Sequence, residues 1–517
     1  MKQIEIDLTP EQYHIESELF RAVARKLDVA VGDVDRVVML RSSLDSRRGA
    51  VRYHASAQVY LGGEPYAEPD YSSPYRDCRS AEPVVIVGAG PAGLFAALRA
   101  LELGLKPIIV ERGKPVESRK YDIAQLTRQH TVNPDSNWCF GEGGAGTYSD
   151  GKLYTRSTKR GDIGAILRKF VEHGADPAIL VETHAHIGTD RLSGIIARMR
   201  QTIENHGGEY HFGKKVADIS VVDGRTTGVV TTDGDVIGGR AVILATGHSA
   251  RDIYALFSRH NWLLEAKPFA LGVRVEHRQS LINSIQYHSK NPSPLLPPAA
   301  YSLTAQADGH GVFSFCMCPG GVIVPAATAD GQQVVNGMSN SRRNSPYANS
   351  GIAVTVDVAD VPQYARFGSL ALLRFQEDVE RRMAVATKQP LAAPTQRLTD
   401  FCQRKSSATL NPSGYMGETV AAPLHELLPP FVADALRQGF TMFDRKMHGF
   451  MTAEASLLAV ESRTSSPVRI PRSADGCHSQ VDGLYPCGEG AGYAGGIVSS
   501  AMDGCRAVEQ IYAKLNG

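Results

Sequence analysis

Apolar and polar positions alternate along the first 80 residues in a pattern that predicts a small α+β module. Residues 3–8, QIEIDL, have the two-residue period of a strand, and residues 9–12, TPEQ, form a capping box with proline at the first helical position. We expect a helix from there to about Lys26, with Ile15 on its apolar face. The resulting β-α-β-β order is compatible with a ferredoxin-like module, whose other two strands are predicted at residues 35–43 and 51–61.

From residue 83 the pattern changes to that of a βαβ unit. PVVIVGAGPAGLFAALRALELGLKPIIVER has the order strand, glycine turn, helix, second strand. The tail has a strand, a glycine-rich loop and a closing helix, whereas residues 262–464 mix strand and helix signals. We therefore predict an α/β fold with three parts: an N-terminal module of residues 1–80, a discontinuous domain of residues 81–261 and 465–517, and an inserted mixed α+β domain of residues 262–464.

The βαβ unit contains a dinucleotide-binding motif of the Rossmann type. Gly88 permits the tight turn, Gly90 lets a pyrophosphate approach the backbone, and Gly93 lets the helix pack closely on the sheet. The N-terminus of the helix offers unpaired N–H groups to the phosphates. A carboxylate at the end of the second strand can accept hydrogen bonds from a ribose and disfavours a 2′-phosphate, so the motif predicts FAD or NAD. The residues expected to bind the nucleotide here are Gly88, Gly90, Pro91, Ala92, Gly93, Glu111 and Arg112.

Three segments farther along the chain are assigned to the cofactor, and the second and third of them favour FAD over NAD. The first follows the βαβ unit as FGEGGAGTY, a glycine-rich loop whose backbone can contact a flat or charged ligand. The second, ATG, ends an apolar strand, and two-domain FAD proteins place such a segment beside the nucleotide. The third precedes the last helix, which we expect to direct its positive end toward the flavin. The predicted cofactor-binding residues of these segments are Gly143, Gly144, Gly146, Thr147, Ala245, Thr246, Gly247, Gly488, Glu489, Gly495, Gly496 and Ile497.

Four residues are candidates for chemistry beside the flavin. Lys152 is either a cation near flavin or substrate or a solvated surface lysine. Cys316 and Cys318 are either a redox pair, if their pKa values are lowered, or buried side chains of a strand. His248 is a candidate acid or base, or else a structural histidine. The sequence presents no Ser-His-Asp or metal-binding constellation.

Composition and charge argue against several classes of protein. The hydrophobic content of 43% and charged content of 21% are those of a globular protein, and 55 Lys and Arg against 54 Asp and Glu give a net charge of +1. That balance creates no global field for nucleic acid or membranes, although Arg47-Arg48 and Arg342-Arg343 are open as a local basic patch or as surface arginines. The start of the chain lacks a signal-peptide apolar region and the eight cysteines lack disulfide-framework spacing, so we expect a reducing, cytoplasmic location without a membrane span.

Long segments of the chain also resemble a known family. They are FGEGGAGTYSDGKLYTR, FCMCPGGVIVPA, NGMSNSRRNSPYANSG and GEGAGYAGGIVSSAMDG, which begin at residues 140, 315, 336 and 488. With them the chain resembles the large bacterial family of FAD-dependent dehydrogenases related to the HI0933-like flavoproteins and, more distantly, the glutathione-reductase-type folds. The resemblance spans nearly the whole chain and implies FAD, an inserted substrate domain and oxidoreductase chemistry. It implies no particular substrate, although some relatives reduce conjugated carbon–carbon double bonds.

We therefore expect an FAD-dependent oxidoreductase with two half-reactions. NADPH or NADH delivers hydride to flavin N5, and the reduced flavin passes a hydride to an electrophilic small molecule such as a conjugated alkene. The chain offers no second nucleotide-binding fold, which suggests that reductant and substrate visit the same face in turn. Three alternatives stay open: a flavin oxidase or dehydrogenase with another acceptor, an RNA-modifying flavoenzyme, and a non-catalytic flavin redox sensor. The sequence leaves the substrate and the oligomeric state open.

Overall fold

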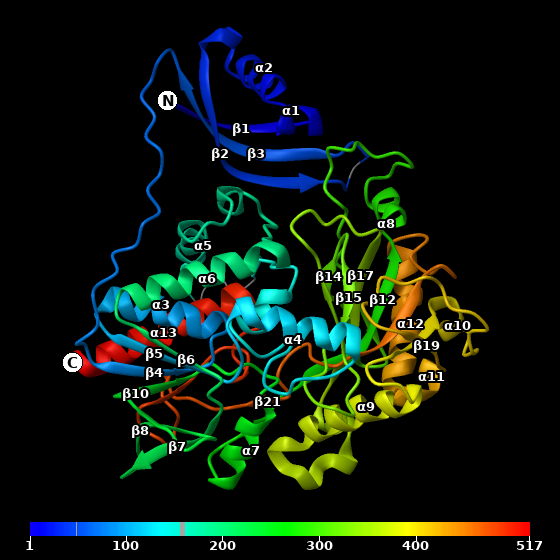
Figure 1. The fold of residues 1–517 in the computed structure, drawn as a ribbon. Coiled ribbons are helices and arrows are strands. Elements are labelled where there is room, and N and C mark those ends of the chain that lie inside the picture. The colour runs from blue at the N-terminus through cyan, green and yellow to red at the C-terminus, as the bar shows by residue number, and fades with distance from the viewer. Residues whose placement is uncertain (48, 156–160) are drawn as a thin grey trace.

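A five-stranded parallel sheet carries the glycine motif in the computed structural model, which describes residues 1–47, 49–155 and 161–517 (Figure 1). The strands lie in the order β22-β10-β4-β5-β6, and each neighbouring pair is parallel. Its central strands are continuous apolar runs because a parallel sheet is covered on both faces. The strands are β4 (Pro83–Val87), β5 (Lys106–Glu111), β6 (Glu209–Phe212), β10 (Ala241–Leu244) and β22 (Leu484–Pro486).

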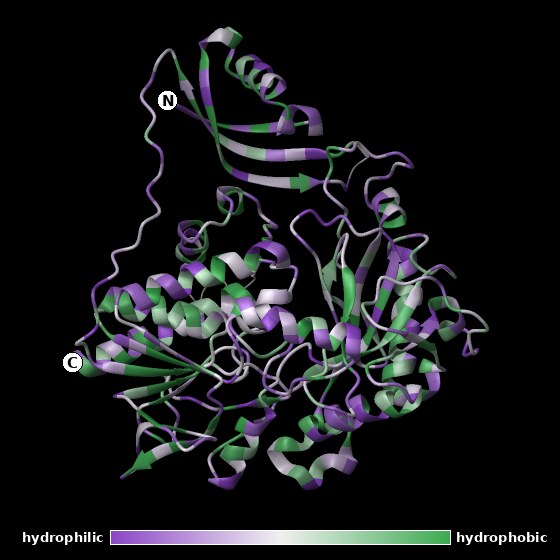
Figure 2. Ribbon diagram, in the orientation of Figure 1, coloured by the Kyte–Doolittle hydropathy of each residue, from purple (hydrophilic) through white to green (hydrophobic). Residues whose placement is uncertain are grey.

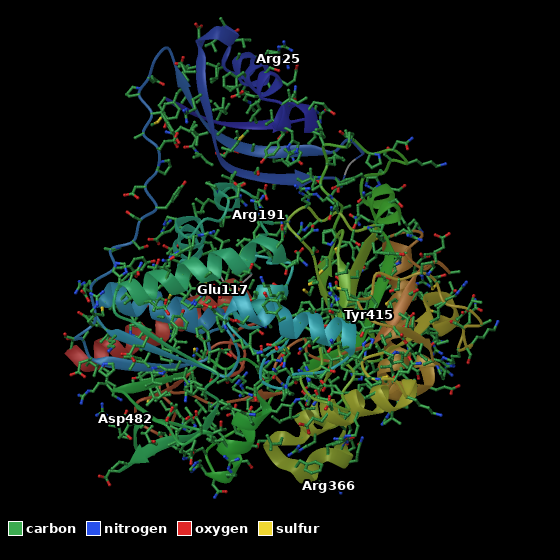
Figure 3. All side chains as sticks on the ribbon, viewed as in Figure 1. Arg25, Glu117, Arg191, Arg366, Tyr415 and Asp482 are labelled. Carbon is green, nitrogen blue, oxygen red and sulfur yellow. The ribbon has the colours of Figure 1, made fainter. Side chains whose placement is uncertain are left out.

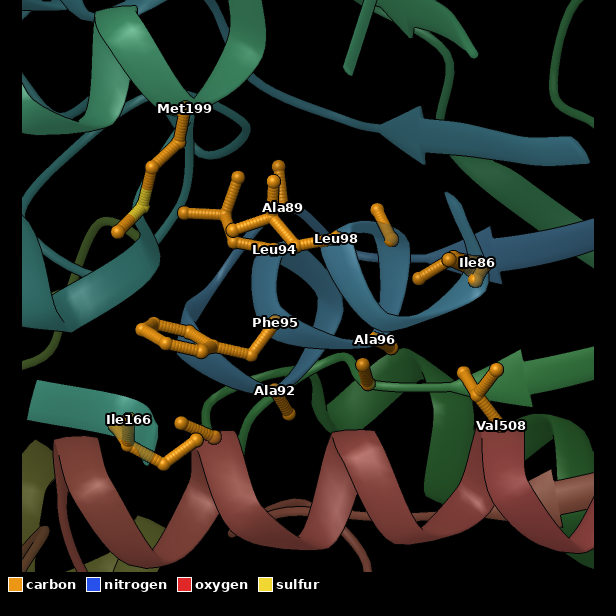
Figure 4. Packing of buried hydrophobic residues seen from close by; sticks show 14 of the residues in the cluster. Ile86, Ala89, Ala92, Leu94, Phe95, Ala96, Leu98, Ile166, Met199 and Val508 are labelled. Carbon is orange, nitrogen blue, oxygen red and sulfur yellow. The ribbon is translucent and has the colours of Figure 1, made fainter. Parts of the chain in front are cut away.

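Two helices from opposite ends of this part of the chain pack tightly beside the sheet. They are α3 (Pro91–Leu103) and α13 (Ile497–Asn516), and a Cβ added at Gly504 of α13 would lie 2.0 Å from the carbonyl oxygen of Ala92. Figure 4 shows Ala92 and Ala96 of α3 facing α13. The remaining helices here are α4 (Val116–Gln129), α5 (Ile163–Glu172), α6 (Thr189–Asn205) and α7 (Arg251–Arg259).

An antiparallel meander leads the chain back into the parallel sheet. Its strands β7, β8 and β9 are neighbours in sequence and in space. They span Val216–Val222, Arg225–Thr231 and Val236–Gly238, and β10 follows directly. The segment Ala245-Thr246-Gly247 therefore leaves the sheet beside the carboxyl end of β4, since β10 and β4 run parallel.

The second large sheet has seven strands in the order β13-β14-β17-β12-β20-β18-β19. All its pairs are antiparallel except β18 with β19. All seven strands fall within the range predicted for the inserted domain, and Figure 2 shows hydrophobic residues gathered along the strands of both large sheets. The strands are β12 (Phe269–Arg278), β13 (Thr304–Ala307), β14 (His310–Cys318), β17 (Tyr347–Val356), β18 (Ala393–Arg397), β19 (Thr419–Ala421) and β20 (Ser456–Glu461).

Helices and two short ribbons complete this part of the molecule. The helices are α8 (Gln279–Gln286), α9 (Ala371–Thr387), α10 (Leu398–Cys402), α11 (Leu424–Leu427) and α12 (Pro430–Lys446). The ribbons pair β11 (Glu265–Ala266) with β21 (Val468–Arg469), and β15 (Val322–Pro325) with β16 (Val335–Met338). Tyr415 lies inward and donates a hydrogen bond to the Leu391 carbonyl at 2.6 Å, whereas Arg25 and Asp482 lie at the periphery (Figure 3). The division into domains at the predicted boundaries stays a prediction.

The N-terminal module has the predicted β-α-β-β order and the spatial strand order β1-β3-β2. Its helical region corrects the sequence analysis, because it breaks at Ile15, whose side chain is 42% exposed instead of facing the core. The predicted capping box at Thr9 is confirmed. Backbone hydrogen bonds join Ser42 to Val181 and Thr183. The module therefore contacts the segment 81–261, which contains the glycine motif. Its elements are β1 (Lys2–Leu8), α1 (Pro10–His14), α2 (Glu16–Leu27), β2 (Val34–Asp45) and β3 (Arg52–Leu61).

None of the helices in the described ranges combines the length and the apolarity that crossing a bilayer requires.

Candidate functional site

Two glycines of the motif are required by backbone packing alone. Gly88 has φ +104°, and a Cβ there would lie 2.5 Å from the Ala245 carbonyl oxygen. A Cβ at Gly93 would lie 1.9 Å from the Gly88 carbonyl oxygen, so only glycine lets α3 approach the turn this closely. These contacts join the turn after β4 to the end of β10, as the roles assigned to Gly88 and Gly93 require.

Other glycines of the predicted cofactor segments line open space. At Gly90, whose φ is −75°, the nearest atom to an added Cβ would be the Cα of Gly144 at 3.9 Å. At Gly495 nothing lies within 4 Å, and neither position has a positive φ. Neither steric crowding nor backbone conformation therefore explains glycine at these two sites. Gly247 and Gly496 also face open space, although each has a positive φ. A cradle of bare backbone with the uncapped N-terminus of α3 beside it fits a dinucleotide phosphate.

The tertiary structure brings the predicted cofactor segments together around the N-terminus of α3. Gly146 lies against Pro91 of α3 and Ile497 of α13, at 3.1 and 3.5 Å from an added Cβ. An added Cβ at Gly488 would lie 3.1 Å from the Ala92 Cβ, and one at Gly490 would lie 2.6 Å from the Gly247 carbonyl oxygen. All the segments assigned to FAD from the sequence thus border one cradle. The cofactor contacts of each residue stay predictions.

Glu111 and Arg112 have partners of their own in the protein. The carboxylate of Glu111 accepts hydrogen bonds from the backbone N–H groups of Ala89, Gly113 and Gly141 at 2.9–3.0 Å. Three of its roughly four lone-pair sites are occupied, so the carboxylate shapes the glycine loops and keeps room for one more donor such as a ribose hydroxyl. Arg112 pairs with Asp252 at 2.7 Å.

The glycine loop around residues 141–147 is held by an arginine that the sequence analysis missed. Arg119 of α4 is fully buried and donates to the carbonyl oxygens of Asn137, Glu142 and Gly144 at 2.7–2.9 Å. Burial lowers its pKa. A signal was present, since positions 119, 123 and 126 lie on one helical face and the other two are Ile and Leu. The Thr147 hydroxyl also bonds inward, to the Glu142 carbonyl at 2.9 Å, and its contact with the cofactor stays a prediction.

His248 and Glu489, predicted from separate segments, face each other. The Nε2 of His248 lies 3.5 Å from the Oε2 of Glu489. Desolvation raises the pKa of Glu489 to about 7, and the charge of Cys316 adds to this effect. Desolvation and the nearby arginines 463 and 251 lower the pKa of His248 to about 4. The pair is therefore a neutral imidazole beside a carboxyl that gives up its proton near neutral pH.

The other candidates form a second cluster that adjoins the first. The ammonium of Lys152 contacts the carbonyl oxygen of Met317, between Cys316 and Cys318. Arg274 of β12 is fully buried, donates to the Cys316 carbonyl oxygen at 2.6 Å and pairs with Glu461. The sequence analysis also missed Arg274, although an arginine inside the apolar strand LGVRVEHR indicates a buried, paired cation. Lys152 is thus more than a solvated surface lysine.

The expectation for the two arginine pairs, a basic patch or surface arginines, is corrected in part. Arg343 is 12% exposed and binds the buried carboxylate of Asp150 at 2.6 Å, so it is no surface arginine. The guanidinium of Arg343 holds the pKa of Asp150 below its ordinary value, against the effect of burial. Arg47 is exposed and pairs with Asp45, and Arg48 lies outside the described residues. RNA binding through these pairs stays untested.

In the described ranges, no group of three His, Cys, Asp or Glu side chains is placed to hold a metal ion.

Comparison with known proteins defines the class. A family described as FAD binding domain matches residues 83–127, and one described as FAD-dependent protein, C-terminal domain-like, matches residues 268–464. A domain of unknown function matches residues 1–60. Together with the cradle, these matches define an FAD-binding flavoprotein.

A protein of Clostridium beijerinckii, described only as uncharacterized, is 38% identical over 518 residues, which cover 96% of each chain. This chain belongs to the same family as that protein.

Several solved flavoenzymes are similar at low sequence identity. An open flavocytochrome c3 fumarate reductase is 13% identical, with a TM-score of 0.36 over 84% of this chain and 78% of that one. Glycine oxidase from Bacillus cereus is 13% identical, with a TM-score of 0.30 over 84% and 95%. CtdE in complex with FAD is 11% identical, with a TM-score of 0.33 over 83% and 82%. Likenesses of this degree say nothing about substrate or electron donor.

Proposed function

We propose that this protein is an FAD-dependent oxidoreductase that takes a hydride from NADPH or NADH and reduces an electrophilic small molecule, such as a conjugated alkene. The observation that carries the proposal is the position of the His248–Glu489 pair, because Glu489 belongs to the same loop as the glycines of the cofactor cradle. Bound FAD would supply two-electron transfer between donor and substrate. Reduction of a double bond by hydride also needs a proton, which the pair is placed to provide.

In the proposed reaction, different residues of the chain bind the cofactor, supply the proton and orient the substrate. Gly90 and the uncapped N-terminus of α3 bind and orient the diphosphate. The N-terminus of α13 directs a partial positive charge toward the cradle, since its N-cap Gly496 offers no side-chain cap. Glu489 holds a proton up to about neutral pH and donates it, and His248 stays a neutral imidazole that orients the carboxyl. Lys152 orients an electron-rich part of the substrate, and residues 262–464 shape its pocket and exclude water.

The proposal is tested by anaerobic visible spectroscopy of the purified protein. Its flavin bands are recorded before and after NADPH is added, and then NADH. Bands that bleach within seconds support a nicotinamide-driven reductase and identify the donor. Bands that persist with both nucleotides but bleach with dithionite contradict the nicotinamide step and favour a substrate dehydrogenase.

A further inference from the structure

Strand β14 leaves regular strand geometry at Cys316. Phe315 pairs with Gly351 of β17, and Cys318 pairs with Asn349. Strand β14 therefore has one residue more than β17 between these two pairs, which is a β-bulge. Cys316 has φ +45°, a left-handed conformation that a residue other than glycine seldom adopts. In a regular strand, alternate Cα atoms lie about 6.6 Å apart, near the upper limit for a disulfide. A bulge with a left-handed residue bends the backbone and shortens this span.

The two thiols occupy one compact turn and differ in exposure. The Sγ of Cys318 donates to the carbonyl oxygen of Cys316 at 3.3 Å. Cys318 is buried, whereas Cys316 is partly exposed. A partly exposed cysteine beside a buried one suits thiol–disulfide chemistry, because one sulfur reacts while the other resolves.

Two cations flank this turn. The guanidinium of Arg274 donates to the Cys316 carbonyl oxygen at 2.6 Å and lies 3.8 Å from the Cys318 Sγ. The ammonium of Lys152 bonds to the carbonyl between the two cysteines. Hydrogen bonding from Cys318 and then the charges of Lys152 and Arg274 lower the pKa of Cys316, while that of Cys318 is raised. Cys316 is therefore the thiol of the pair that ionises more readily.

The turn also adjoins the cofactor segments. Lys152 follows the glycine loop, and the charge of Cys316 contributes to the raised pKa of Glu489 in the loop before α13. The thiol pair thus has a neighbour in two segments of the FAD cradle. Cys402, a partly exposed cysteine at the end of α10, has one arginine, Arg437, near it, and burial nevertheless raises its pKa.

From this arrangement we propose that Cys316 and Cys318 form a thiol–disulfide couple that exchanges two electrons with FAD. In the oxidising direction, two S–H bonds break and one S–S bond forms. Two electrons and one proton pass to FAD, and the second proton leaves to Glu489 or to water. In the reducing direction, the two-electron-reduced cofactor returns the electrons, the S–S bond breaks and both sulfurs regain protons. The proposal rests on FAD binding in the proposed function, and not on the choice of NADPH or NADH.

The test counts electrons and thiols in the holoprotein. The protein is oxidised with ferricyanide, freed of reagent and titrated anaerobically with dithionite. Wild type is expected to take up two electron pairs per FAD, one for the flavin and one for the disulfide. Cys316→Ser and Cys318→Ser are each expected to take up one pair, whereas the control Cys402→Ser takes up two. In parallel, alkylation under denaturing conditions and mass spectrometry are expected to find the peptide with both cysteines lighter by two hydrogen atoms after oxidation.

Two results overturn the couple. One is uptake of a single pair by wild type with both cysteines alkylated after oxidation, and the other is Cys316 oxidised or modified alone while Cys318 stays free. If Cys318→Ser fails to fold, the partly exposed Cys316→Ser still decides the question. Because dithionite replaces the nicotinamide, failure of NAD(P)H to bleach the flavin contradicts the proposed function and leaves this result intact.

Discussion

The imidazole of His248 and the carboxyl of Glu489 lie 3.5 Å apart, although 241 positions separate the two residues in the chain. His248 follows the end of β10 and Glu489 follows the end of β22, which is the neighbour of β10 in the parallel sheet. Because carboxyl ends of parallel strands meet at one edge of a sheet, the fold brings the two groups together. Their pKa values move in opposite senses, since desolvation penalises the charged form of each.

Glu489→Gln is expected to make stability less dependent on pH. The pKa of Glu489 is about 7 in the folded protein against an ordinary value of 4.5, so its contribution to stability is complete below 4.5 and is lost as pH rises to about 7. Glutamine cannot ionise, and the variant should gain about 2 kcal/mol over wild type above pH 7, less than the full shift gives because the side chain is 29% exposed. Urea unfolding of the FAD-free proteins near pH 4.5 and pH 8 measures this. The exposed control Glu454→Gln should show no such gain, and an equal gain at both pH values for Glu489→Gln would contradict the assignment.

Gly90→Ala and Gly93→Ala are expected to fail in different ways. The Cβ of an alanine at 93 would lie 1.9 Å from the Gly88 carbonyl oxygen, so the helix must shift and stability should fall by about 3 kcal/mol or more. An alanine at 90 meets no atom closer than 3.9 Å, so the protein should fold normally and lose FAD affinity at least tenfold. Thermal unfolding of the apoproteins and fluorescence titration with FAD separate the two effects. Full flavin binding by Gly90→Ala would show that the cofactor does not approach this backbone.

Arg119→Lys is expected to destabilise the protein although it keeps the charge. The guanidinium reaches several carbonyl oxygens of the glycine loop at once, and a lysine ammonium cannot reproduce that fork. Carbonyl groups left without donors should cost about 3 kcal/mol and reduce FAD content. The control is Arg128→Lys on the exposed face of the same helix, which should change stability by less than about 0.5 kcal/mol. Similar unfolding temperatures for the two variants would refute the structural role.

Lys152→Met is expected to slow the reaction of Cys316 with iodoacetamide near neutral pH. The lysine cation helps to lower the pKa of that thiol, together with Arg274 and against Asp150. Its removal raises the pKa, so the rate should fall by roughly fivefold, which corresponds to about 1 kcal/mol of screened attraction. Peptide mass spectrometry at several pH values gives the rate at Cys316 alone, with the exposed Lys290→Met as control. An unchanged pH profile would mean that Lys152 leaves the thiol unaffected.

Much of the fold could be predicted from local pattern. The βαβ unit at residue 83, the capping box at Thr9 and the closing helix each depend on residues within one short segment. The sequence analysis misplaced Ile15, because the apolar period continues across a break that only the backbone reveals. It treated Arg343 as a surface residue, because its carboxylate partner Asp150 lies far away in the chain.

The sequence by itself determined the class of this protein, because a glycine turn between a strand and a helix lets the backbone approach a phosphate, and residues within one short segment specify that turn. Only the tertiary structure decided which reactive groups meet. His248 and Glu489 are brought together by neighbouring strands, and Lys152 reaches the Met317 carbonyl between the two cysteines, 165 positions away in the chain. The buried arginines 119 and 274 likewise find their acceptors only after folding. The pKa shifts of these groups follow from desolvation and from the charges of residues distant in the chain. Both effects depend on which segments pack together and exclude water.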